Sequence, residues 1–159
     1  MKSINTWLSE YGESHKNATN KTIHWVCVPL IFFSVIGLLA AIPATWLNNI
    51  FGGAGARYLH YGTLVLALGL LFYLRLSVVM FLGIAAFSAL CLRGVVYLQM
   101  LDFPLWGSSL IIFAAAWIGQ FIGHNIEGKK PSFLKDIQFL LIGPAWLMAF
   151  IFKRLGIKY

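Results

Sequence analysis

The chain has 159 residues, of which 60% are hydrophobic and only 11% are charged, and its mean hydropathy is +0.80. A soluble domain carries about 25% charged residues, so the composition excludes a soluble globular protein and predicts a single integral membrane domain over residues 1–159. The net charge of +7 comes largely from lysines beside the apolar runs. This pattern is typical of membrane topology and not of nucleic-acid binding.

An N-terminal surface helix and a turn are expected in residues 1–19. Four of its apolar residues recur at helical spacing, which predicts a short helix lying on the membrane surface: Ile4, Trp7, Leu8 and Tyr11. The first apolar run, about 22–42, is long enough to cross a membrane, since a crossing needs about 20 apolar residues. Asn20 is a candidate cap for this helix, and the turn-rich stretch NNIFGGAGA (48–56) follows it.

Three more apolar runs predict three further crossings, so that residues 20–126 hold four transmembrane helices. The runs cover residues 58–74, 77–98 and 103–126. Residues 127–159 are expected to form a basic loop and a C-terminal helical segment. The apolar run 137–152 in this segment is short and contains Gly143-Pro144, and proline disrupts helical hydrogen bonding. The predicted fold class is therefore an all-α integral membrane protein.

The basic residues predict the orientation, because Lys and Arg gather on the cytoplasmic side. The N-terminal lysines, Arg75 and the lysines after residue 126 share one side if the chain crosses four times. A fifth crossing would place the basic C-terminus on the other side. We therefore expect residues 137–152 to be interfacial or re-entrant and both termini to be cytoplasmic. The expected location is a bacterial inner membrane, or the endoplasmic reticulum in a eukaryote.

Polar groups converge at the predicted cytoplasmic boundary. His24 lies near the start of the first span and His124 near the end of the fourth, and the turn-forming KNATN (16–20) lets His15 fold back towards them. Glu127 lies on the same helix face as His124. Imidazole and carboxylate are ligands for Fe(II), Zn or Mn, and a few of them with open positions suit non-haem Fe(II) oxygen chemistry.

Other polar residues are expected to support this site. Four amides could orient the ligands by hydrogen bonding: Asn17, Asn20, Gln120 and Asn125. Lys129 and Lys130 are more often topology signals than ligand contacts, but as a cationic rim beside a metal site they would attract a fatty carboxylate. His60 lies near the start of the second span, at the opposite boundary, and is expected to be an interfacial histidine.

Two stretches, YGESHKNATNKTIHWVCVP (11–29) and WIGQFIGHNIEGKKPSFLKDIQFLLIGP (117–144), resemble the small membrane family typified by the fungal 2-hydroxy fatty acid dioxygenase. They share His, Asn, Asn and His followed by Pro, and then Gln-Phe-x-Gly-His and an acid before a basic-Pro run. The resemblance implies an Fe(II)-dependent enzyme that uses dioxygen to shorten 2-hydroxy fatty acids by one carbon in a membrane. It also implies that His15, His24 and His124 are essential, metal-binding positions.

The fungal members carry a further histidine late in the third span, where CLRGVVYLQM (91–100) has none. The fourth metal ligand therefore stays open: the candidates are Glu127, water, and His60 if the predicted topology is wrong. Cleavage of the C1–C2 bond with both oxygen atoms incorporated takes its electrons from the substrate, so no reductant is required. The alternatives are a haem-binding electron carrier with His24 and His124 as axial ligands, a Zn-dependent membrane lipid hydrolase, and a non-enzymatic scaffold or small transporter.

Overall fold

The computed structural model describes residues 2–51, 56–130 and 139–159, and their regular secondary structure is helical, without strands. The all-α class is confirmed. The helices are, in chain order, α1 (Ile4–Gly12), α2 (Ala18–Ala40), α3 (Thr45–Phe51), the 3-10 helix η1 (Ala56–Tyr58), α4 (Tyr61–Leu76), α5 (Val78–Leu98), α6 (Leu105–Glu127) and α7 (Phe139–Arg154).

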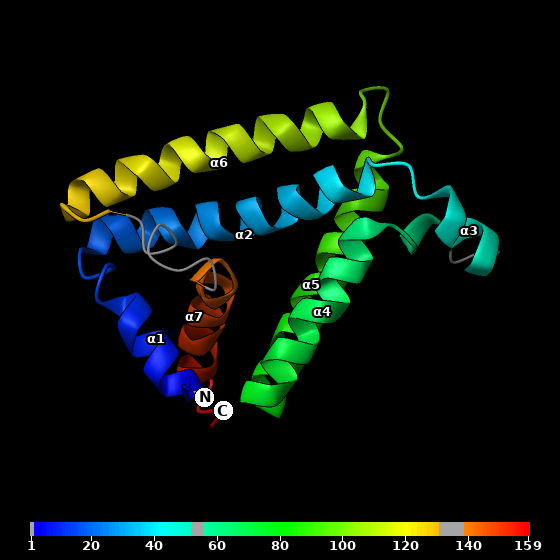
Figure 1. The fold of residues 1–159 in the computed structure, drawn as a ribbon. Coiled ribbons are helices and arrows are strands. Elements are labelled where there is room, and N and C mark those ends of the chain that lie inside the picture. Colours follow the sequence, from blue (N-terminus) through cyan, green and yellow to red (C-terminus); the bar gives the residue numbers. More distant parts are fainter. Residues whose placement is uncertain (1, 52–55, 131–138) are drawn as a thin grey trace.

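Two antiparallel helix pairs make up most of the molecule (Figure 1). In one pair, α2 and α6 lie side by side along their length. In the other, α4 and α5 cross this pair at a steep angle, near the C-terminal end of α2. Of the remaining helices, α1 and α7 pack together beside the N-terminal half of α2.

Small residues permit the close contact between α2 and α6. A Cβ at Gly119 would lie 2.6 Å from Cys27 Sγ, and a Cβ at Gly123 would lie 2.5 Å from Asn20 Oδ1. Gly119 and Gly123 have the GxxxG spacing that lets helices approach closely in membranes. The C-terminal end of α6 is therefore held directly against the N-terminal end of α2.

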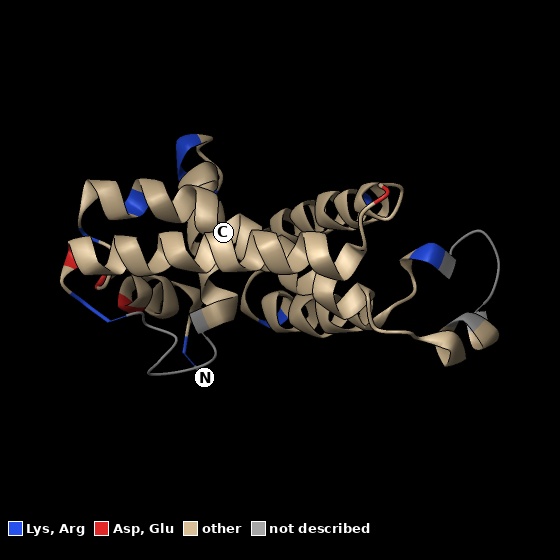
Figure 2. Cartoon of the chain, turned by 90° about the horizontal axis from the view of Figure 1, so that it is seen from above, with Lys and Arg blue, Asp and Glu red and all other residues tan. Residues whose placement is uncertain are grey.

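Three of the described helices are long and apolar enough to cross a membrane: α2, α5 and α6. The second apolar run forms α4, which has only 16 residues. At 1.5 Å per residue it rises about 24 Å, less than the roughly 30 Å of a hydrocarbon core. The predicted count of four crossings is thus not confirmed. Charged residues lie mainly near the helix ends (Figure 2), and the orientation in the membrane stays a prediction.

The predicted N-terminal helix is present as α1, with Ser3 as its cap. Its apolar face is buried against α7, where Trp7 and Tyr11 pack with Trp146 and Leu147. This partner was not predicted, because helical spacing shows that a helix has an apolar face but not what covers it.

The predicted start of the first span was wrong by about one turn. The cap is Asn17, not Asn20: Asn17 Oδ1 accepts hydrogen bonds from the backbone N–H groups of Thr19, at 2.8 Å, and Asn20, at 3.3 Å. These bonds satisfy two of the N–H groups that a helix leaves unpaired at its start. The earlier start places Asn20 inside the helix, on its buried side.

Two further local predictions differ from the structure. The C-terminal helix continues through Pro144 without a break, and residues 48–51, predicted as a turn, end α3. Residues 52–55 of that turn-rich stretch lie outside the described residues. So do Lys135 and residues 137–138 at the start of the expected C-terminal segment.

Candidate metal centre

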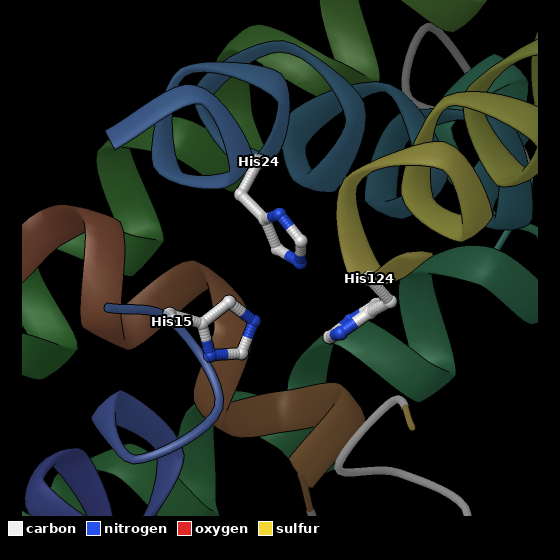
Figure 3. Close-up of side chains that lie close together, drawn as sticks. All are labelled: His15, His24 and His124. Carbon is white, nitrogen blue, oxygen red and sulfur yellow. The ribbon is translucent and has the colours of Figure 1, made fainter. Parts of the chain in front are cut away.

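Three histidines from three separate segments point towards one another at the N-terminal end of α2 (Figure 3). His15 lies in the link between α1 and α2, His24 in the second turn of α2, and His124 in the last turn of α6. One ring nitrogen of each lies within 4.8 Å of the others. The side chains are 3%, 1% and 5% exposed, respectively. The structure thus brings together the histidines that the sequence predicted to converge.

Hydrogen bonds to the backbone leave ring nitrogens of this cluster free. His15 Nδ1 lies 2.6 Å from the carbonyl oxygen of Tyr11, and His24 Nδ1 lies 2.9 Å from that of Asn20. A carbonyl only accepts, so Nδ1 carries the proton in both rings and Nε2 keeps its lone pair. Both Nε2 atoms, and Nδ1 of His124, are buried and have no hydrogen-bond partner in the part of the chain that the structure describes. Metal-binding histidines commonly donate their other ring N–H to a carbonyl in this way.

Aromatic side chains from α1 and α7 cover the cluster. Tyr11 stacks on His15 with ring centroids 4.2 Å apart and an interplanar angle of 11°, and the Trp146 ring lies 5.2 Å from His15. Burial lowers the pKa of His15 to about 4, because a buried imidazolium loses its hydration. The ring is therefore neutral near pH 7, which is the form that binds a metal.

Glu127 lies outside the three-histidine group. Its Oε1 accepts a hydrogen bond from the backbone N–H of Lys16 at 2.8 Å. Its Oε2 accepts from the N–H of Asn17 at 2.9 Å and from Asn20 Nδ2 at 3.0 Å. We call these three hydrogen bonds the Glu127 latch. They fasten the segment that follows His15 to the end of α6, so Glu127 supports the position of His15.

The four amides predicted to support the ligands have different environments. Asn17 caps α2, and Asn20, which is 0% exposed, joins the latch and also donates to the carbonyl of Ser14 at 3.3 Å. Gln120 is buried on α6, one turn before His124. Asn125 is exposed on α6, so the structure does not place it in support of the histidines.

The two lysines predicted to attract a carboxylate also differ. Lys129 Nζ donates to the carbonyl of Glu13 at 2.9 Å, so this side chain helps to hold the link that contains His15. Lys130 is exposed. Neither lysine lines the cavity that adjoins the histidines.

His60 does not belong to the cluster. It caps α4, whose start meets α2 at Ile36: a Cβ at Gly62 would lie 2.8 Å from the Ile36 carbonyl oxygen. Ile36 is 12 residues after His24 in the same helix, a rise of about 18 Å. The separation of His60 from the other three histidines, predicted from the charge pattern, is present in the structure.

An apolar cavity of about 380 Å³ extends from the histidines into the molecule. His24, His124 and Gln120 line one part of it, and the lining continues to Ile36 on α2 and Ser88 on α5. Among the residues that the structure describes, no Lys, Arg, Asp or Glu lines it. At about 30 Å³ per water-sized unit, this volume holds roughly a dozen methylene-sized groups, as in the tail of a fatty acid.

Some residues of the site were missed in the sequence. The GxxxG spacing of Gly119 and Gly123, which brings α6 against α2, is readable in the sequence. The covering of His15 by Trp146 is not, because it depends on where α7 docks. The cavity has no local sequence signal, since its described lining residues come from six helices and most of them look like ordinary apolar residues of spans.

A family model described as 2-hydroxy-palmitic acid dioxygenase Mpo1-like matches residues 1–155. No curated protein and no solved structure matches the chain. The matched range includes all three clustered histidines and the Glu127 latch.

Proposed function

The chain belongs to the Mpo1-like family, described as 2-hydroxy-palmitic acid dioxygenase Mpo1-like, and we propose that it is an Fe(II)-dependent membrane dioxygenase. It would cleave a 2-hydroxy fatty acid to the fatty acid that is one carbon shorter. The observation that supports this most directly is the junction of three unpartnered histidine nitrogens with an apolar cavity of acyl-tail size.

The residues present fit a divalent metal ion. The buried, unpartnered ring nitrogens of His15, His24 and His124 form a three-nitrogen donor set. Three ligands leave coordination positions open, as oxygen-activating iron sites require, whereas structural zinc sites are closed by four protein ligands. Bound there, Fe(II) would supply the centre at which dioxygen and the hydroxy-acid head react.

The cavity supports a single-chain amphiphile as the substrate. Its apolar lining would take the alkyl tail, and its polar end at His24, His124 and Gln120 would take the carboxyl and hydroxyl groups. The Gln120 amide can donate a hydrogen bond to a carboxylate. Because no described Lys or Arg, Lys129 and Lys130 included, lines the cavity, the negative charge of the head would be balanced at the histidine cluster.

The rest of the site would position His15 and exclude water. Tyr11 and Trp146 cover the His15 ring, while the Glu127 latch fixes the backbone that follows it. Low polarity around a reacting centre strengthens the electrostatic interactions within it. The buried Tyr11 has its pKa raised by desolvation, so its phenol stays neutral beside the cluster.

The proposal is tested with purified protein, Fe(II), ¹⁸O₂ and a 2-hydroxy fatty acid labelled with ¹³C at C2. We expect the C2 label in the carboxyl group of the shortened acid and ¹⁸O in that product, with His124→Ala inactive. Activity with Zn(II) and no dioxygen consumption would instead favour a lipid hydrolase. A Soret band in the purified protein would favour a haem-binding electron carrier.

A further inference from the structure

A second cavity, of about 230 Å³, lies at the opposite end of α2 from the three histidines. It is formed by the last turn of α2 and the chain that follows it, together with Arg57 of η1, His60 and Gln99. It shares no described lining residue with the cavity that adjoins the histidine cluster. The proposed dioxygenase reaction gives it no role.

His60 presents a buried donor without an acceptor in this cavity. The N–H of Thr63 donates to His60 Nδ1 at 3.2 Å, which caps α4. Since Nδ1 accepts, the proton of the neutral ring is on Nε2. The side chain is only 5% exposed, and Nε2 has no hydrogen-bond partner among the described residues. An unsatisfied buried donor is unfavourable, so the site suits a ligand atom that accepts a hydrogen bond.

Arg57 makes an oxyanion the best such ligand. Among the described residues of the lining it is the one Lys, Arg, Asp or Glu, and no described acidic side chain forms a salt bridge with it. A guanidinium binds phosphate or carboxylate oxygens through paired hydrogen bonds. The side-chain amide of Gln99 lines the same cavity and can add a further donor.

The surroundings favour an anion that belongs to a lipid. Ile42, Pro43 and Leu59 line the cavity beside these donors, and Ile42 is 48% exposed. In the neighbouring elements, Trp46 Nε1 donates to the hydroxyl of Tyr61 at 3.0 Å. Trp and Tyr are enriched at the level of lipid headgroups. A headgroup phosphate bound here would have apolar side chains next to its glycerol and acyl groups.

We propose that this second cavity binds the phosphate of a membrane phospholipid, with His60 Nε2–H and the Arg57 guanidinium as its donors. The bound lipid would hold η1 and the start of α4 against the end of α2. This site is independent of the proposed dioxygenase activity, and its failure would leave that proposal unaffected.

Native mass spectrometry of the full chain, released from detergent with added phosphatidylglycerol, tests the site. His60→Asn keeps a good helix cap but removes Nε2–H, and Arg57→Gln removes the charge. Each should weaken lipid binding about tenfold, the effect of losing a hydrogen bond to a charged group. Arg93→Gln is the matched control, because Arg93 is exposed on α5 and does not line the cavity; its binding should be unchanged.

Two competitors identify the ligand. Diacylglycerol with the same acyl chains should not bind, and glycerol phosphate should displace the lipid only at large excess. Equal binding of diacylglycerol, or equal loss in Arg93→Gln, would overturn the phosphate site. If glycerol phosphate displaced phosphatidylglycerol at an equal concentration, the bound phosphate would not need to belong to a lipid, and the phospholipid would be ruled out as the specific ligand. Arg57 is exposed, so Arg57→Gln is expected to fold. If His60→Asn does not fold, the lipid affinity of Arg57→Gln alone tests the phosphate site.

Discussion

Replacing Glu127 by Gln is expected to weaken metal binding without changing the atoms that bind the metal. The carboxylate accepts hydrogen bonds from Lys16, Asn17 and Asn20. Gln has one accepting oxygen, and its NH₂ group would face a donor, so at least one bond and the charge are lost. A hydrogen bond to a charged group contributes about 1.5–3 kcal/mol. Glu127 is partly exposed, so solvent screening reduces the expected loss to about 1–2 kcal/mol.

This free energy should appear in the metal affinity, because the three-histidine site requires the segment with His15 to be docked. A loss of about 1–2 kcal/mol corresponds to a roughly 5–30-fold weaker affinity. Titration of the metal-free protein with Co(II) measures the affinity, and the visible Co(II) bands report the ligand set. Hydrogen exchange at the amides of Lys16 and Asn17, which the latch occupies, should become faster.

The matched control is Glu10→Gln, which removes the same charge from α1. Glu10 forms an exposed salt bridge with Lys2 at 2.7 Å and no described contact with the histidines, so affinity and Co(II) bands should be unchanged. A changed Co(II) spectrum in Glu127→Gln would refute the reasoning and make Glu127 a ligand, as the sequence had suggested. Unchanged exchange at both amides would show that the latch does not restrain the segment.

Three other outcomes are expected. Alanine at His15, His24 or His124 should each abolish tight metal binding, whereas His60→Ala should retain it; bound metal per chain, measured in folded protein, distinguishes these results. The folded-state pKa of His15, about 4, lies below its ordinary 6.5, so between these values the unfolded chain binds a proton that the folded chain does not. Above pH 6.5, His15 should therefore not affect the free energy of unfolding of the metal-free protein. Towards pH 4 that free energy should fall, by up to about 3 kcal/mol. A thermal midpoint that does not decrease from pH 7 to pH 5 would contradict this. Gly69 lines the apolar cavity, and Gly69→Leu should reduce binding of long-chain 2-hydroxy acids more than that of short-chain ones, so an unchanged ratio of affinities would show that the tail lies elsewhere.

The parts of the fold that depend on local composition could be predicted from the sequence. The apolar runs located α2, α5 and α6 to within a few residues, apart from the earlier start of α2. The span count was less predictable, because α4 follows an apolar run yet is shorter than a bilayer core. Hydropathy shows where a chain avoids water, whereas helix length also depends on caps such as Asn17 and His60.

The candidate site could be predicted only in part. Charge topology placed His15, His24 and His124 at one boundary, and the structure brings them together. The role of Glu127 was not predictable from the sequence. An acidic residue at this end of α6 could either bind a metal or accept the hydrogen bonds of the Glu127 latch. The difference lies in whether backbone N–H groups or ring nitrogens face the carboxylate, which is determined by the path of residues 15–17.

The wide sequence separation of the histidines has a consequence for biosynthesis. His24 in α2 and His124 in α6 are 100 residues apart. At a synthesis rate of about 5–20 residues per second, His124 is therefore made roughly 5–20 s after His24. During this interval a nascent chain in the translocation machinery has at most two of the three imidazoles, and no Glu127 to fasten His15. Metal acquisition should therefore follow insertion of α6, and chains truncated before it should leave the ribosome without metal. A bound metal ion would then mark chains whose membrane insertion has been completed through α6.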